Sequence, residues 1–163
     1  MFIIKWLVIA AALLAVAAVV AGQLGFYQGK APGDLGVRNG KLKPPSDTEN
    51  SVTSQAALYP DHPQRRYAEI APLALNGDGP AMLARIKAIV EGMDGAKIVK
   101  SEPGYLYAQF TTKLMRFVDD AEFWFDPAAN VIQVRSASRV GRRDLGVNRK
   151  RIEAVRSALA TGR

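Results

Sequence analysis

The sequence predicts an α+β domain, with a short antiparallel sheet covered on one face by helices, behind an apolar N-terminal segment. Apolar residues recur at helical spacing in two segments, within residues 78–93 and 149–160. Between them lie about four segments in which apolar and polar residues alternate, as in strands with one buried face. The order along the chain is helix, antiparallel meander and helix. Both helices bury their apolar stripes best if they pack on the same face of the sheet.

The N-terminal segment, residues 1–28, predicts a membrane anchor. No charge occurs between Lys5 and Lys30, and residues 6–27 form an apolar run of 22 residues. A helix needs about 20 such residues to cross a bilayer. A cleaved signal peptide is the alternative, because small residues around 19–21 resemble a cleavage site. The run is longer than a usual signal-peptide core, so a retained single-pass transmembrane helix is favoured.

Two signals for the orientation of this anchor conflict. Positive residues after the run favour a cytoplasmic domain, whereas the signal-like N-terminus favours an exported one.

Residues 29–50 are rich in glycine and proline and poor in apolar residues. Such a composition predicts a flexible linker that lifts the domain off the membrane. The folded domain is therefore expected at residues 51–163.

The domain elements follow in order. Residues 52–58 are expected to add an apolar contact, and residues 70–75 a short strand. The first domain helix begins at Asp78-Gly-Pro, where the aspartate caps and the proline lies just inside. Its apolar stripe ends near residues 92–95. Strands are predicted at residues 96–100 and 105–111, joined by a Glu-Pro-Gly turn.

A hairpin follows, with strands predicted at residues 121–126 and 132–135. Pairing Phe123 with Val134 keeps the apolar side chains on one face and sets Glu122 opposite Arg135. A slip of one residue would place phenylalanine against glutamine, so this register is expected. The last helix is predicted from about Arg149 to Ala160, with Asn148 as its N-cap and Val147 and Ile152 as a hydrophobic staple.

The charge is concentrated at one end of the chain. The formal net charge is +7, and residues 139–163 hold eight basic residues and two acidic ones. A basic segment favours anionic lipid, phosphate or nucleic acid as a partner, and it is otherwise a solvated helix face. Nucleic acid is disfavoured because no interleaved aromatics and no nucleic-acid motif occur. The chain has no cysteine, which excludes disulfides, thiolate chemistry and a lipoprotein anchor.

Three carboxylates before the hairpin are candidates for chemistry. Asp119, Asp120 and Glu122 could hold a metal or act as a general acid and base. Since Arg135 is the expected cross-strand partner of Glu122, a structural ion-pair network is favoured and no metal or cofactor is predicted.

Two serines of the hairpin have a weaker claim to chemistry. Ser136 and Ser138 share the face of the apolar strand residues, so small-residue packing is favoured over a nucleophile role. The single histidine, His62, lies far away in a proline-flanked loop. It supports neither a triad nor a metal site by itself.

The arginines near the last helix are the best candidates for a site. Arg149, Lys150 and Arg151 occupy its first turn, where cations oppose the helix dipole at a cost of roughly 0.3–1 kcal/mol each. Either carboxylate partners or a bound anion would compensate for this cost. The predicted network comprises Arg135, Arg139, Arg149 and Arg151 with Asp119, Asp120, Glu122 and Asp144.

Three blocks of this sequence occur in the order typical of a known family. They are Phe117-Val-Asp-Asp-Ala-Glu-Phe, Val131-Ile-Gln-Val-Arg-Ser-Ala-Ser-Arg-Val-Gly and Asp144-Leu-Gly-Val-Asn-Arg-Lys-Arg-Ile-Glu. Over roughly residues 42–159 the chain resembles the domain of unknown function DUF1499, found in bacterial envelope proteins and plastids. The resemblance implies a family fold and no established activity. A single-pass protein of a bacterial inner membrane with a periplasmic domain is expected, with its orientation left open. Ser51 stands where the family usually has cysteine, so a thiol role is not expected.

Three classes of function are compatible with these features. The first is a membrane-anchored binding or scaffold domain whose arginines accept an anionic lipid or a phosphate-bearing ligand. The second is a hydrolase that uses the three carboxylates, and the third is a nucleic-acid binder. The first is favoured, with the catalytic residues, the ligand and the oligomeric state left open. It is distinguished from the second by whether arginines cover the carboxylates or leave them in an open pocket.

Overall fold

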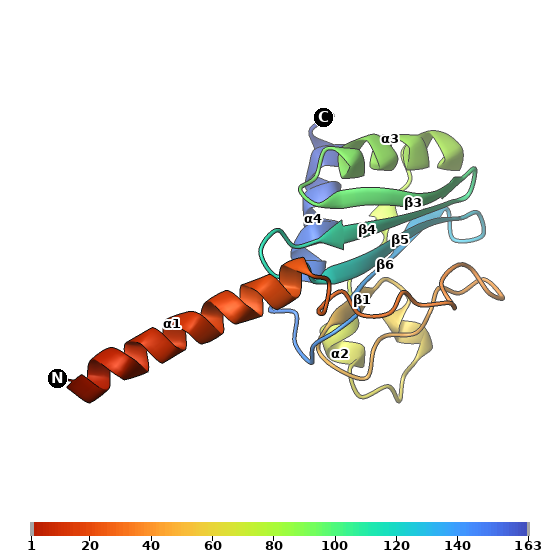
Figure 1. Ribbon diagram of the computed structural model, residues 1–163. Coiled ribbons are helices and arrows are strands. Elements are labelled where there is room, and N and C mark those ends of the chain that lie inside the picture. The colour runs from red at the N-terminus through yellow and green to blue at the C-terminus, as the bar shows by residue number, and fades with distance from the viewer. Residues whose placement is uncertain (1, 163) are drawn as a thin grey trace.

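The structure is a computed structural model that describes residues 2–162. Residue 1 of the predicted anchor and residue 163 of the predicted domain therefore lie outside the described residues. A long helix, α1 (Phe2–Gln23), projects from a domain built around a single sheet, as Figure 1 shows. The predicted α+β class is confirmed.

The sheet has six strands, the four of the expected meander and two short ones. The main strands are β3 (Ala96–Glu102), β4 (Tyr105–Thr111), β5 (Val118–Asp126) and β6 (Val131–Ser138). They form an antiparallel meander, and β1 (Ser51–Thr53) and β2 (Leu73–Ala74) both pair with β6. β2 lies within the short strand expected at residues 70–75, whereas β1, with three residues, is too short for alternation of apolar and polar residues to reveal it.

The hairpin register is as predicted. Phe123 lies opposite Val134, and Glu122 lies opposite Arg135. The side chain of Phe123 is fully buried on the face of the sheet that carries the hydrophobic core. The need to bury this face therefore selects the pairing, because a shift of one residue would turn every apolar side chain outwards.

Two helices cover the apolar face, α3 (Gly79–Glu91) and α4 (Val147–Ala160). As predicted, Asp78 caps α3, and its Oδ1 accepts a hydrogen bond from the amide of Ala81 at 2.9 Å. Two short helices, η1 (Ala56–Leu58) and α2 (Arg65–Ala68), lie between β1 and β2. The core of the domain consists of the facing apolar side chains of the sheet, α3 and α4.

The start of α4 differs from the prediction. The helix begins at Val147 rather than near Arg149, so Asn148 lies in its first turn instead of at the N-cap. Asp144 takes over the capping, since its carboxylate accepts hydrogen bonds from the amides of Gly146 at 2.9 Å and Asn148 at 3.0 Å. The cap was misassigned because the side chain of Asn148 is used for a contact with the sheet.

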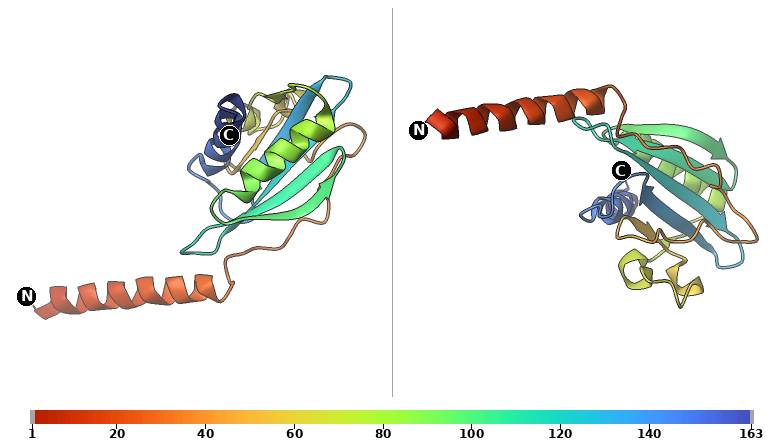
Figure 2. Two further views of the ribbon diagram at one scale, coloured as in Figure 1. Left: turned by 90° about the horizontal axis from the view of Figure 1, so that it is seen from above. Right: turned by 60° about the horizontal axis from the view of Figure 1, so that its bottom comes forward.

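Residues 34–45, called the covering segment below, lie against the face of the sheet opposite α3 and α4. The two views of Figure 2 show this part of the chain on that side. The amide of Gly36 donates to Glu122 Oε1 at 2.7 Å, and Arg135 Nε donates to the carbonyl of Pro44 at 3.3 Å. The expected flexible linker is thus hydrogen-bonded to the sheet. Composition alone missed these contacts because backbone groups make them.

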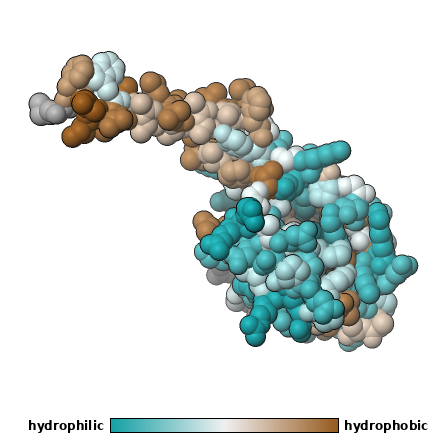
Figure 3. Space-filling model, turned by 90° about the horizontal axis from the view of Figure 1, so that it is seen from below, coloured by the Kyte–Doolittle hydropathy of each residue, from teal (hydrophilic) through white to brown (hydrophobic). Residues whose placement is uncertain are grey.

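The helix α1 is long and apolar enough to cross a membrane, and its most apolar stretch is not buried against the domain. In Figure 3 it forms a brown, hydrophobic arm that projects from a mainly teal, hydrophilic domain. A signal sequence has the same length and composition, and both interpretations made from the sequence remain open for this helix.

Candidate functional site

The carboxylates predicted to form one network point to two different faces of the sheet. Asp119 and Asp120 are neighbours on β5, and successive side chains of a strand point to opposite faces. Asp119 therefore meets the helices, while Asp120 and Glu122 share the face beneath the covering segment. The structure brings the predicted residues together as two separate groups, because strand geometry prevents a single one.

On the helix face, Arg151 is the centre of a buried ion pair. Its Nη2 lies 2.6 Å from Asp119 Oδ2, and both side chains are less than 10% exposed. Its Nη1 donates to Asn148 Oδ1 at 2.7 Å and to Ser136 Oγ at 3.0 Å. The guanidinium also lies 4.3 Å from the ring centre of Phe110. These contacts compensate for a cation in the first turn of a helix, as the sequence predicts.

Asn148 ties the start of α4 to β6 and to Asn50, the residue before β1. Its Nδ2 donates to the carbonyl of Asn50 at 3.1 Å and to Ser138 Oγ at 2.9 Å, and its Oδ1 accepts from Ser136 Oγ at 2.6 Å. The residue is fully buried. The two serines thus share the apolar face as predicted, and they also hydrogen-bond to the helix.

Asp144 holds the loop before α4. Besides the two backbone amides, it accepts hydrogen bonds from the hydroxyl of Tyr67 and from Asn148 Nδ2. Burial opposes its ionised form, but these hydrogen bonds prevail and lower the pKa of Asp144 below its usual value. Arg149 Nη2 donates to the carbonyl of Tyr67 at 2.6 Å. Arg149 therefore contacts a carbonyl here rather than one of the predicted carboxylates.

On the opposite face, Asp120 and Arg139 form a bidentate pair. Arg139 Nε lies 2.8 Å from Asp120 Oδ2, and Arg139 Nη2 lies 2.7 Å from Oδ1. The hydroxyl of Tyr107 donates to the same Oδ1 at 2.5 Å and accepts from Gln109 Nε2 at 2.8 Å. Burial and the bond to Asp120 raise the pKa of Tyr107. This group is closed, since the guanidinium and the phenol occupy both oxygens of the carboxylate.

Glu122 lies beside it at the centre of the sheet and is fully buried. Its Oε1 accepts from the hydroxyl of Tyr105 and from the amide of Gly36, each at 2.7 Å. Its Oε2 is 3.7 Å from Arg135 Nη1 and has no hydrogen bond among the described residues. Burial lowers the pKa of Arg135, and the nearby carboxylate partly offsets that change.

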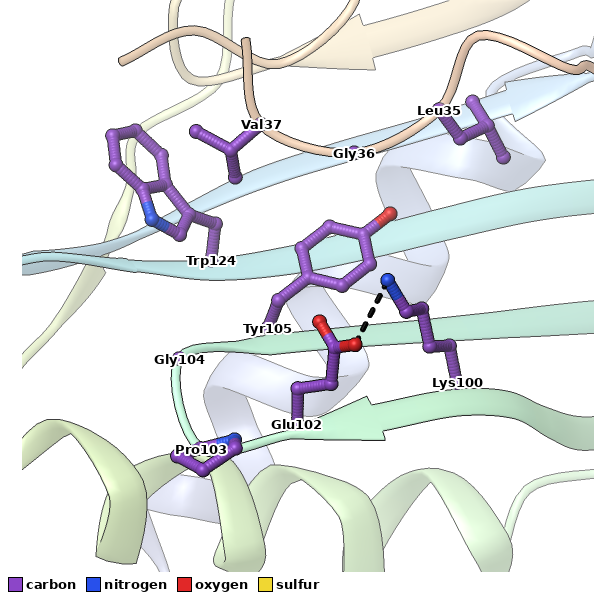
Figure 4. A pocket seen from close by; sticks show the side chains of 9 residues that line it. All are labelled: Leu35, Gly36, Val37, Lys100, Glu102, Pro103, Gly104, Tyr105 and Trp124. Atoms are coloured by element: carbon purple, nitrogen blue, oxygen red, sulfur yellow. Dashed lines mark ion pairs between the residues drawn. The ribbon is translucent and has the colours of Figure 1, made fainter. Parts of the chain in front are cut away.

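A cavity lined by Tyr105 and Gly36, the two hydrogen-bond partners of Glu122, opens at the edge of the covering segment. It has a volume of about 700 Å³, and Figure 4 shows the side chains that line it. Trp124 and Tyr105 supply aromatic rings, and the ammonium of Lys100 lies 5.7 Å from the ring centre of Tyr105. Lys100 also pairs with Glu102 at 2.9 Å, but both side chains are about half exposed. Solvent therefore weakens this ion pair.

The candidates chosen from the sequence do not include this cavity. Trp124 and Tyr105 fall on the polar face of predicted strands, where an aromatic residue is a signal for binding. The wall formed by residues 35–37 was missed, because a glycine-rich segment carries no periodic pattern that would show where it packs. The group chosen from the sequence, in contrast, consists of charges that are already paired.

The residues proposed for catalysis are not arranged as an open acid–base pair. Arginine side chains lie against Asp119 and Asp120, and Tyr105 and Gly36 hold Glu122. His62 Nε2 lies 3.5 Å from Asp47 Oδ1, and its Nδ1 accepts a hydrogen bond from the amide of Gln64. Among residues 2–162 no cluster of three or more metal-ligating side chains occurs.

The comparisons with known proteins agree with the sequence blocks described above. The model of the family described as protein of unknown function (DUF1499) matches residues 41–159. No curated protein and no solved structure matches this chain. The matched range begins within the covering segment and extends almost to the end of α4. The chain therefore belongs to the DUF1499 family of proteins of unknown function.

Proposed function

We propose that the protein is a membrane-anchored binding domain that takes a small ligand in the cavity beside Trp124. The cavity is the observation that carries this proposal, since it is large enough for a small molecule and combines aromatic walls with a few polar groups. In the proposal α1 is the retained anchor, in a bacterial inner membrane, and the domain lies in the periplasm.

A binding role is supported over a hydrolase by the state of the carboxylates. A general acid or base needs a carboxyl group within reach of a substrate, and a metal needs several free ligands. Asp119 and Asp120 lie against guanidinium groups at 2.6 and 2.7 Å, and both are nearly inaccessible to solvent. These contacts favour the structural ion pairs over the catalytic alternative.

The same contacts limit the anion site proposed from the sequence. Arg139 and Arg151 are paired with carboxylates, and Arg149 is bonded to a backbone carbonyl. Their binding of an external anion stays a prediction, because it requires that these contacts break. Lys100 is better suited to accept an anion, since its pairing with Glu102 is exposed and weak.

The lining of the cavity defines the chemistry of the proposed ligand. A ring of the ligand would stack against Trp124, as aromatic side chains prefer flat partners. An acidic group of the ligand would reach the ammonium of Lys100. We therefore propose a small anionic molecule with a ring face, held at the entrance to the polar centre formed by Tyr105 and Glu122.

Fluorescence and mass spectrometry together test this proposal. The chain has two tryptophans, Trp6 in α1 and Trp124 in the cavity, so a Trp6→Phe protein reports on the cavity alone. Full-length protein from its own membrane should carry a co-purifying anionic molecule in native mass spectrometry. After removal of that molecule, adding it back should quench or shift the emission of Trp124.

Two variants complete the test. Lys100→Ala should lose the bound molecule, whereas Val99→Ala, an exposed neighbour on β3 that does not line the cavity, should keep it. If the protein carries no adduct and anionic extracts of its membrane leave the Trp124 emission unchanged, the proposed function is wrong. The orientation is tested by protease access in spheroplasts, where only a periplasmic domain is cut.

A further inference from the structure

The end of α1 packs directly on the domain, without a free tether. Gly22 is buried, and a side chain there would lie 2.7 Å from the carbonyl oxygen of Met115. The side-chain amide of Gln23 donates to the carbonyls of Lys113 at 3.1 Å and Leu114 at 2.8 Å. The loop between β4 and β5 thus lies beside the last turn of the apolar helix. A membrane crossed by α1 would end at the level of this loop.

The chain after α1 continues along the same surface. The ring of Tyr27 lies 5.6 Å from that of Phe117, in a tilted arrangement. Gly29 has a φ of +65°, and a side chain on it would lie 2.8 Å from Arg139 Cβ and 2.9 Å from Val140 Cγ1. These close approaches require a glycine. They bring the second loop of this end, between β6 and α4, next to the anchor.

Apolar side chains are exposed mainly at this end of the domain. Nine large apolar side chains after α1 are exposed in the described chain, and six of them lie in or beside these two loops and the end of α1. The six are Leu24, Phe26, Leu114, Phe117, Leu145 and Val147. Phe117, Leu145 and Val147 line one shared cavity of about 250 Å³, so the two loops are neighbours. Figures 1 and 2 show both loops on the side from which α1 leaves.

Leu145 is the most informative of these residues. Its φ is +51°, in the left-handed region that leucine rarely adopts, and 85% of it is exposed. A strained backbone normally persists only where other interactions hold it. A leucine side chain exposed to water contributes no hydrophobic free energy that could offset this strain. An apolar environment outside the protein would supply the missing compensation.

Cations lie near these apolar side chains in the same two loops and at the start of α4. Lys113, Arg116, Arg142 and Lys150 have no ion-pair partner within the described chain. A mixture of exposed apolar and basic side chains is typical of surfaces that lie in the interface of an anionic membrane. It is complementary to lipid phosphates in charge and to acyl chains in polarity.

We propose that this end of the domain lies on the lipid bilayer, with Leu114, Phe117 and Leu145 inserted below the headgroups. Lys113 and Arg142 contact the phosphates of anionic lipids. The inference rests on the proposed anchoring by α1, which sets the membrane surface at Gln23. The domain is then held in a single orientation on the membrane, rather than lifted away from it by a linker.

Site-directed spin labels on the full chain in nanodiscs test this proposal. The chain has no cysteine, so single Cys variants give one label each. The bilayer is phosphatidylcholine with phosphatidylglycerol at three to one. A label at Leu145 should be accessible to oxygen and protected from a water-soluble nickel reagent. A label at Val99, exposed on β3, should show the reverse, and a label at Leu13 reports on the anchor itself.

The three positions separate the inference from the proposed function. A buried label at Leu13 with a water-exposed label at Leu145 would overturn the inference and leave the anchoring intact. A water-exposed label at Leu13 would refute the anchoring itself, and with it the basis of the inference. Membrane-buried labels at both positions, with Val99 in water, are the expected result.

Two further variants separate membrane contact from folding. Leu145→Asn relieves the backbone strain, so the melting temperature should hold or rise while a label at Leu114 moves towards water. The double variant Lys113→Ala, Arg142→Ala should lower the affinity of this end of the domain for the anionic bilayer by about fivefold for each charge removed. The proposed lipid contacts would be contradicted if the spin label at Leu114 lies at the same depth in pure phosphatidylcholine as in the bilayer with phosphatidylglycerol, and if neither variant changes that depth.

Discussion

Replacing Arg151 by methionine is expected to be strongly destabilising, because it leaves a buried carboxylate without its partner. Asp119 is only 4% exposed, and its contact with Arg151 Nη2 is the one ion pair it has in the described chain. The other partners of the guanidinium are less affected. Ser136 Oγ donates to Asn148 Oδ1 at 2.6 Å, a hydrogen bond that does not involve Arg151.

The expected loss follows from these contacts. Breaking a buried ion pair by removing one partner costs about 3–5 kcal/mol. With a denaturant dependence of about 2 kcal/mol per molar urea for a domain of this size, the unfolding midpoint falls by roughly 2 M. Lys150→Met, at the exposed neighbouring position on α4, should change the free energy of unfolding by no more than about 0.5 kcal/mol.

Urea unfolding of the full chain in detergent micelles, followed by circular dichroism, measures these differences. A double variant, Arg151→Met with Asp119→Leu, replaces the pair with apolar side chains and should regain most of the loss. The reasoning is refuted if Arg151→Met shifts the midpoint by less than about 0.5 M, or if the double variant is no more stable than the single one.

Three further changes test other parts of the structure. Burial and the hydrogen bond to Asp144 raise the pKa of Tyr67 to about 12, above the ordinary value of 10.0, so its contribution to stability is complete below pH 10 and lost as the pH rises towards 12. Melting temperatures of wild type and Tyr67→Phe should therefore converge over that range, and parallel curves would contradict the shift. Gly22→Leu should push α1 off the loop between β4 and β5, seen as a broader distance distribution between spin labels on the two elements. Glu122→Ala removes the acceptor of the Gly36 amide, so hydrogen exchange at Gly36 should accelerate; unchanged exchange would show that this bond does not hold the covering segment.

The sequence predicted the elements whose side chains alternate between core and solvent. The register of β5 and β6 followed from Phe123 and Val134, because burial of one face allows a single pairing. The cap of α3 by Asp78 likewise depends on local chemistry alone. Such features are encoded within a few residues of one another, so one sequence is sufficient to find them.

The features that were missed depend on contacts between distant residues. The covering segment binds the sheet through the amide of Gly36 and the carbonyl of Pro44, and backbone groups leave no pattern in a sequence. Arg151 and Arg139 pair with carboxylates, but Arg149 does not, and Asp119 and Asp120 point to opposite faces of the sheet. Predicting one network from them neglected the alternation of a strand, which had already been applied to Glu122 and its neighbours.

The central claim is that α1 remains part of the protein and holds the domain at the membrane. The intact mass of the protein, measured after its native membrane and soluble fractions are separated, tests this claim most directly. We expect the full-length mass, with residues 6–27 present, in the membrane fraction alone. The mass of a chain that begins at Gly22, found in the soluble fraction, would show that α1 is a cleaved signal peptide and would refute the anchoring.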